Sequence, residues 1–176
     1  MTTTETATGR IDFTMMYLTH DAFRRDLRRL RQAADADRAD SLGVQTGWAN
    51  FKRQLTVHHT VEDEALWPRV EAASAGRADA AEILAAMAAE HGRLDSLLDA
   101  VDTAMAQHSA ALPEIAAGLA AGLEDHMRHE EEAALPLIQD VLEPGDWAEF
   151  GKAMARKQKL SGAAAYVPWV LDGATA

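Results

Sequence analysis

Two stretches of the chain share one pattern of histidine, glutamate and proline. Residues 126–136 read HMRHEEEAALP, and residues 58–68 read HHTVEDEALWP. Both fit the pattern His-x3-Glu-acidic-Glu-Ala-x2-Pro. Because residues four apart lie above one another on a helix, each stretch offers an imidazole and a carboxylate side by side. Two such pairs in one small chain are the ingredients of a two-metal site.

The composition predicts one helical domain. The chain has 176 residues, of which 48% are apolar, so a sizeable core is available. Alanine is abundant, while aromatic and β-branched residues are few, and this balance favours helices. No strand pattern competes with the helical periodicity described below.

Charge and cysteine content exclude several classes of protein. The net charge is −11, and the arginines within 24–31 are accompanied by acidic residues within 21–37, so we expect a solvated helix face and no nucleic-acid partner. No apolar run approaches the roughly 20 residues that span a bilayer, and the N-terminus lacks the apolar core of a signal peptide. With no cysteine, any metal must take imidazole and oxygen ligands. These features predict a cytoplasmic protein without a membrane partner.

The spacing of apolar residues predicts an all-α fold. Apolar side chains recur at steps of three and four along four long segments, which favours an up-down-up-down four-helix bundle. The predicted boundaries are a disordered tail at 1–10, the bundle at 11–142 and an extension at 143–176. The extension is expected to begin with a turn at residues 143–146, which read EPGD, and to hold a short helix at about 147–159 and a last piece that is extended or briefly helical. Pro68 and Pro136 lie inside helical patterns, where we expect a kink or frayed end.

Each of the four helices places a histidine on its inward face, and two of them add a glutamate four residues later. One buried histidine is ordinarily a satisfied core residue, and one glutamate is ordinarily solvated. Together, however, they would bring unpaired carboxylates into a dry interior, at a cost of several kcal/mol each. Bound cations would remove that cost. The predicted metal ligands are His20, His58, Glu62, His91, His126 and Glu130.

Ligand arithmetic favours two metal ions. Two octahedral ions offer about twelve positions, of which four imidazoles, two bridging carboxylates and an oxo or hydroxo bridge fill about ten. The remaining positions suit water, dioxygen, peroxide or nitric oxide. Imidazole and carboxylate ligation with open positions is typical of iron or manganese, whereas a structural zinc site is usually closed. We therefore predict two iron ions, with manganese or zinc as possible substitutes.

The order His, His-x3-Glu, His, His-x3-Glu resembles the hemerythrin-like HHE cation-binding domain. The resemblance extends over about residues 13–141, and residues 58–68 are very close to the second-helix motif of that family. It implies a four-helix bundle with a non-heme di-iron centre, whose irons are bridged by two glutamates. The same six residues are carried over as ligands: His20, His58, Glu62, His91, His126 and Glu130.

The chain departs from the oxygen-carrying hemerythrins at two positions. Those carriers have two ligand histidines four residues apart on the third helix, whereas Met87 and Asp95 flank His91. They also have an aspartate five residues beyond the fourth-helix histidine, and here Glu131 has that spacing while Glu130 fits His-x3-Glu. These departures point to the HHE branch, which is linked to sensing or turnover of oxygen, nitric oxide or peroxide and to iron handling.

Several other polar residues lie close to the predicted ligands in the sequence. His59 and Asp63 are rotated about 100° from the ligand row, so we predict that they pair at a helix interface or at the surface. Glu90 is predicted to be solvated, and Glu131 to lie mostly on a solvated face. His129 lies three residues from His126, where a second-shell or entry role stays open.

The predicted function is a non-heme di-iron protein that binds oxygen, peroxide or nitric oxide at an open iron position, with sensing or peroxide-decomposing redox activity. One alternative is a di-iron oxygenase or oxidase that acts on a small organic substrate under the C-terminal segment. The other is an iron store or a structural bundle held together by metal. The small-ligand di-iron protein is the leading prediction of the three, and no oligomeric state is predicted.

Overall fold

The computed structural model describes residues 10–173, except for the side chains of residues 160–164. Within this part of the chain the regular structure is entirely helical, which confirms the predicted all-α class. The elements are α1 (Thr14–Asp35), α2 (Leu42–Val61), η1 (Glu62–Leu66), α3 (Trp67–Ala73), α4 (Ala78–Ala106), α5 (Leu112–His129), η2 (Glu130–Ala134), α6 (Leu135–Val141) and α7 (Pro144–Leu171). No helix of the described part is long and apolar enough to cross a membrane.

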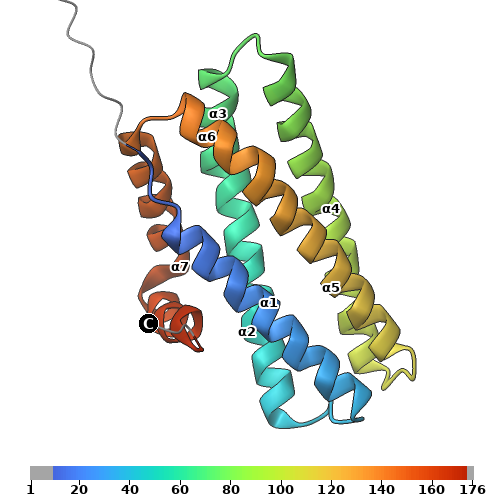
Figure 1. Ribbon diagram of the computed structural model, residues 1–176. Helices are drawn as coiled ribbons and strands as arrows, with labels where there is room; N and C mark the ends of the chain where they lie inside the picture. Colours follow the sequence, from blue (N-terminus) through green and yellow to red (C-terminus); the bar gives the residue numbers. More distant parts are fainter. Residues whose placement is uncertain (1–9, 174–176) are drawn as a thin grey trace, which may run out of the picture.

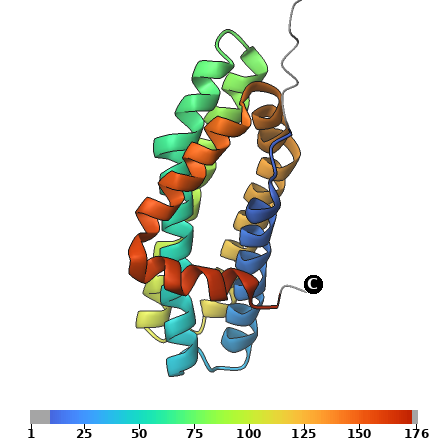
Figure 2. The same cartoon turned by 90° about the vertical axis from the view of Figure 1, so that its left-hand side faces the viewer.

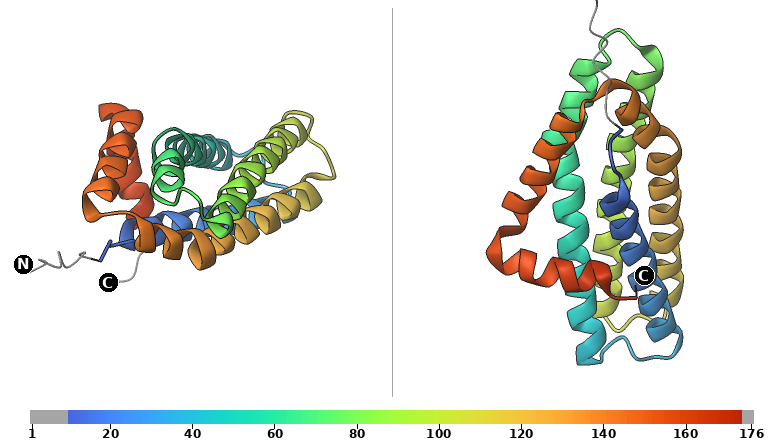
Figure 3. Two further views of the ribbon diagram at one scale, coloured as in Figure 1. Left: turned by 90° about the horizontal axis from the view of Figure 1, so that it is seen from above. Right: turned by 60° about the vertical axis from the view of Figure 1, so that its left-hand side comes forward.

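Four long helical segments lie side by side (Figure 1). They are α1, then α2 continued by η1 and α3, then α4, and finally α5 continued by η2 and α6. Helix α5 packs against both α1 and α4, and α1 also packs against α2. The view from above shows α7 beside these segments, on the side of α1 and α2 (Figure 3). All four long segments therefore contribute to one interior.

Two π-helical turns carry the helices through the prolines that the sequence analysis expected to kink or fray them. A proline lacks an N–H and its ring clashes with the carbonyl four residues earlier. In η1 the backbone N–H of Trp67 bonds the carbonyl of Glu62, five residues back, and in η2 Leu135 bonds Glu130 in the same way. The wider turns let the helix continue as α3 and α6. Such π turns often occur at functional sites, and each begins at a predicted ligand, Glu62 or Glu130.

The apolar core is divided into two clusters. One contains Phe23, Leu55 and Leu94, and the other contains Met16 and Met87. On α1, His20 lies between Met16 and Phe23, and on α4, His91 lies between Met87 and Leu94. All five apolar residues are buried. The polar residues therefore form a layer across the bundle that is closed by apolar side chains above and below.

The C-terminal region is more helical than predicted. Helix α7 begins at Pro144 and extends to Leu171, with a kink at Lys159, where the backbone has φ 56° and ψ 172°. The expected turn at residues 143–146 is instead the start of this helix, and Glu143 N–H donates to Asp146 Oδ2 at 3.3 Å. After the kink α7 crosses over α1 and α2 (Figures 2 and 3). The predicted tail at 1–10 lies outside the described residues, apart from Arg10.

Candidate metal centre

The structure brings all six predicted ligands together in the interior. Helix α1 supplies His20, α2 supplies His58, α4 supplies His91 and α5 supplies His126. The two glutamates begin the π turns, and Glu62 and Glu130 are both 0% exposed. The histidines are also buried. Helical phase thus places the six residues where the sequence pattern predicted.

Their ligand atoms fall into two groups. The first group is His20, His58 and Glu130, and the second is His59, His91 and His126. Within each group the ligand atoms lie within 4.8 Å of one another. Glu62 reaches both groups, because its Oε1 is 2.9 Å from His58 Nε2 and its Oε2 is 3.6 Å from His91 Nε2. This is an arrangement in which one carboxylate can bridge two cations.

Despite these short distances, the same atoms form no hydrogen bond of acceptable geometry. Twelve buried side-chain polar atoms in the described part of the chain have none, and nine of them belong to these residues. The nine are the Nε2 atoms of His20, His58, His59, His91 and His126 and both carboxylate oxygens of Glu62 and Glu130. Buried polar groups are ordinarily satisfied. A cluster of unsatisfied imidazole and carboxylate atoms is the donor set that two divalent or trivalent cations require, so the residues fit a metal pair.

Three of the histidine rings contact, through Nδ1, a carboxylate that lies outside the two ligand groups. Asp63 Oδ1 lies 2.9 Å from His91 Nδ1, Glu131 Oε1 lies 2.7 Å from His20 Nδ1, and Glu90 Oε2 lies 2.9 Å from His126 Nδ1. A carboxylate at Nδ1 fixes the tautomer, so that Nε2 presents a lone pair to a metal. The predictions for Asp63 and Glu90 were wrong in this respect, because each contacts a site histidine.

Burial and mutual charge set the pKa values in the cluster. Burial lowers the pKa of His58 to about 4 and that of His126 to about 4, which keeps both rings neutral, as ligands must be. Burial also disfavours the His20 imidazolium, but the Glu130 carboxylate, whose Oε2 lies 3.1 Å from His20 Nε2, outweighs it and raises the pKa of His20 to about 9. Burial and the nearby Glu130 raise the pKa of Glu62 well above its ordinary value. Without cations the cluster therefore holds protons that metal binding must displace.

His59 lies at the helix interface, one of the two places predicted for it, and the structure adds it to the candidate ligands. It is buried, its ring stacks on His91 at a centroid distance of 4.0 Å, and it belongs to the second ligand group. The 100° rotation from His58 favoured pairing with Asp63 at a helix interface or at the surface over a ligand role. An inward stripe of a bundle helix can be 100° wide, however, so neighbours can both face inward. The His-His doublet before Glu62 was the signal available.

His129 contacts the carboxylate that holds His126. Its Nδ1 lies 2.8 Å from Glu90 Oε1, and the other oxygen of Glu90 contacts His126. His129 is outside both ligand groups and its side chain is 36% exposed. It therefore acts on the centre through Glu90.

Replacing His59 by phenylalanine tests the second ligand group. The substitution keeps an aromatic ring beside His91 and removes both nitrogens. We expect bound metal to fall from about two ions per chain to about one, because a three-histidine group loses a third of its imidazoles. Metal analysis of purified protein measures this, with His108→Phe as the control, since His108 is exposed and pairs with Asp40. Equal metal content in wild type and His59→Phe would contradict the role.

The comparisons with known proteins agree with this geometry. The family model described as the hemerythrin HHE cation-binding domain matches residues 12–138. The chain belongs to the hemerythrin HHE cation-binding family. No curated protein and no solved structure gives a match to the chain. The predicted family is thus confirmed, and the HHE match covers all six predicted ligands and His59.

Membership of the HHE family indicates cation binding, and the buried histidine and glutamate cluster lies within the matched residues. The match ends before α7 begins, so the HHE domain accounts for the four long segments and leaves α7 as a feature beside it.

Proposed function

We propose that this protein is a cytoplasmic non-heme di-iron protein, built on an up-down-up-down four-helix bundle, that binds dioxygen, nitric oxide or peroxide. The single observation that carries the proposal is the set of nine unsatisfied ligand atoms, divided between two groups and joined by Glu62. Five imidazoles and two carboxylates leave positions free around two octahedral ions. Iron in this site would supply redox chemistry toward such small ligands.

The residues around the cluster support the proposal in two ways. Apolar clusters on both sides exclude bulk water, which strengthens electrostatic interactions within the layer. The outer carboxylates Asp63, Glu90 and Glu131 hold three rings in place, and Arg24 Nη1 donates to Glu131 Oε1 at 3.0 Å. Removal of such outer carboxylates typically weakens metal binding by roughly 10–100-fold.

Metal loading followed by ligand addition tests the proposal. Metal-free protein is loaded with ferrous iron without oxygen and then exposed separately to oxygen, nitric oxide and hydrogen peroxide. We expect about two irons per chain, near-ultraviolet bands that change with each ligand, and consumption of peroxide. Zinc-loaded protein is the control, and it should show neither the bands nor peroxide loss. One iron per chain, or equal behaviour of the iron and zinc forms, would contradict a di-iron redox site and favour the structural or storage role.

A further inference from the structure

A cavity of about 450 Å³ lies between α1 and the two parts of α7 and reaches the metal cluster. Its wall includes His58, whose Nε2 belongs to the first ligand group. Most of the remaining wall is apolar, from Met15, Met16, Trp147, Phe150, Met154 and Val167. Ligand pockets of drug-sized molecules have volumes of roughly 300–1,000 Å³ and mainly apolar walls. The cavity thus has the size and lining of a small-molecule site.

The mouth of the cavity is unusually apolar for a surface. Met15 is 50% exposed and Val167 is 52% exposed, and both belong to the wall. They come from α1 and from the part of α7 beyond the kink, so the two helices form opposite rims. An apolar molecule that entered would cover both side chains, and this burial would favour its binding.

Besides His58, one buried polar residue of the wall, Gln158, has an atom without a partner. Gln54 Nε2 donates to Asn50 Oδ1 at 3.3 Å, so Gln54 turns its oxygen to Gln158 and accepts from Gln158 Nε2 at 2.6 Å. This fixes the amide of Gln158 and leaves its Oε1 without a donor in the described part of the chain, although the residue is only 5% exposed. A buried amide oxygen without a donor is costly. A hydroxyl or amine of a bound molecule would satisfy it.

The other polar groups of the wall favour an uncharged molecule. Thr19 donates to Met15 O at 2.7 Å, so Tyr166 must donate its hydroxyl proton to Thr19, which is 2.7 Å away. Asp12 is the charged residue of the wall, and it is exposed. No described Lys or Arg lines the cavity, so the wall itself offers an anion no cationic side chain in exchange for its hydration.

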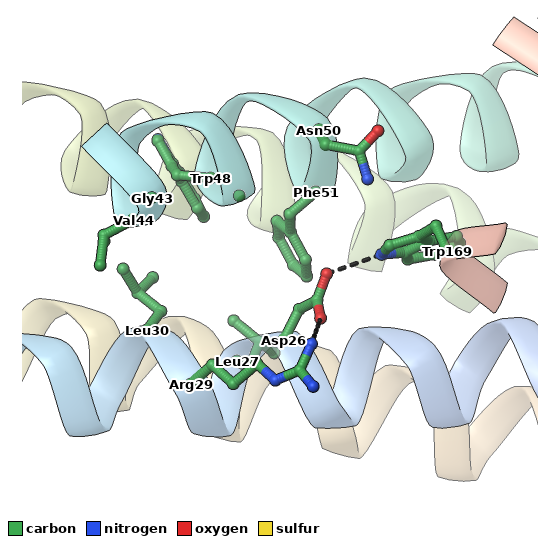
Figure 4. A pocket seen from close by; sticks show the side chains of 11 residues that line it. Asp26, Leu27, Arg29, Leu30, Gly43, Val44, Trp48, Asn50, Phe51 and Trp169 are labelled. Atoms are coloured by element: carbon green, nitrogen blue, oxygen red, sulfur yellow. Dashed lines mark hydrogen bonds and ion pairs between the residues drawn. The ribbon is translucent and has the colours of Figure 1, made fainter. Parts of the chain in front are cut away.

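A second cavity, of about 340 Å³, lacks the polar features of the first (Figure 4). It lies between α1 and α2 and is closed by Trp169, whose Nε1 donates to Asp26 Oδ2 at 2.6 Å. None of the metal-cluster residues line it, and none of its lining side chains has a buried unpaired polar atom. It is a gap under the end of α7 without a connection to the metal cluster.

We propose that the cavity beside His58 binds a small, uncharged, mainly apolar organic molecule that carries one hydrogen-bond donor. The donor bonds Gln158 Oε1, the apolar body lies between α1 and α7, and one edge of the molecule contacts His58. This deepens the proposed function, because it gives the same metal site an organic ligand beside the small inorganic ones. Binding itself does not depend on which metal fills the site.

Calorimetric titration of zinc-loaded protein with 2-naphthol and 2-fluoronaphthalene tests the proposal. The two probes have the same ring system, and only 2-naphthol has a donor. We expect 2-naphthol to bind one site per chain, about tenfold more tightly than 2-fluoronaphthalene, as one hydrogen bond to a buried group implies. In Gln158→Met that preference should disappear. Absence of 2-naphthol binding, or equal affinity for both probes in the wild type, overturns the proposal.

Substitutions at two glycines test the location of the binding site. Gly151 lines the cavity, and a Cβ there meets nothing within 4 Å, so Gly151→Leu can extend a side chain into the space. Gly118 on α5 is equally open but lies outside the cavity, so Gly118→Leu is the matched control. We expect Gly151→Leu to weaken 2-naphthol binding by at least about tenfold and Gly118→Leu to leave it unchanged. Equal affinity of Gly151→Leu and wild type overturns the location.

Nuclear relaxation then reports the distance to the metal. Manganese-loaded protein should broaden the proton resonances of bound 2-naphthol, while zinc-loaded protein should not, because His58 lies in both the cavity wall and the ligand group. Binding without broadening places the molecule away from the centre and overturns contact with His58. A protein that binds 2-naphthol beside manganese but fails the iron and peroxide test would contradict the proposed function and leave this inference intact.

Discussion

Replacing Glu62 by alanine is expected to reduce bound metal from about two ions per chain to fewer than one. Glu62 is the carboxylate whose two oxygens contact different groups, at 2.9 Å from His58 Nε2 and 3.6 Å from His91 Nε2. Its removal takes a ligand from each cation position at once and removes a negative charge that offsets the cations. Metal analysis after dialysis against limiting chelator measures the loss. Two retained ions per chain would contradict the bridging role.

Two further variants make the result specific. Glu64 lies on the same π turn, but it is exposed and pairs with Lys157, so Glu64→Ala should retain wild-type metal content. Glu130 belongs to the group of His20 and His58, so Glu130→Ala should lose the ion of that group first. The three-histidine group should still retain about one ion. Equal loss of metal in Glu62→Ala and Glu130→Ala would contradict two separate cation positions.

Local periodicity was enough to predict the helices and the six inward residues. A histidine within an apolar stripe, such as His20 between Met16 and Phe23, must share the burial of its neighbours on the same face. The structure buries all three. The His-x3-Glu spacing similarly places each glutamate beside its histidine. Helix α7 was predicted too short because Pro144 and Gly145 suggested a turn, whereas proline is also favoured in the first turn of a helix.

Local periodicity did not predict the contacts that side chains make between helices. Glu90 was assigned to solvent from its phase on α4, yet it lies against α5, where it contacts His126 and His129. Asp63 was paired with His59 on its own helix, yet it reaches across to His91 on α4. The rotation of each helix about its axis decides such contacts, and packing against neighbours sets that rotation. The width of the inward stripe on α2, which admits His59, is decided in the same way.

Removal of the metal is expected to lower the melting temperature by on the order of 10 °C. A ligand that binds only the folded state stabilises it by about 4 kcal/mol at a free concentration of 1,000 times its Kd. For a domain of this size each kcal/mol corresponds to roughly 2–4 °C. Metal-free protein also retains nine unsatisfied buried atoms, two carboxylates among them. Differential scanning calorimetry with and without chelator measures the shift, and an unchanged melting temperature would contradict a buried metal centre.

The variant Glu62→Gln separates metal binding from the cost of the buried carboxylates. Burial and the nearby Glu130 raise the pKa of Glu62 well above its ordinary value, so ionised Glu62 is disfavoured when no cation is present. Glutamine keeps the size of the side chain and cannot ionise. We therefore expect metal-free Glu62→Gln to melt at or above the temperature of metal-free wild type, and chelator to change its melting temperature by no more than a few degrees. If chelator lowered the melting temperature of Glu62→Gln as much as that of the wild type, the stabilising metal would bind without the Glu62 carboxylate. That result would contradict the role of Glu62 in joining the two ligand groups.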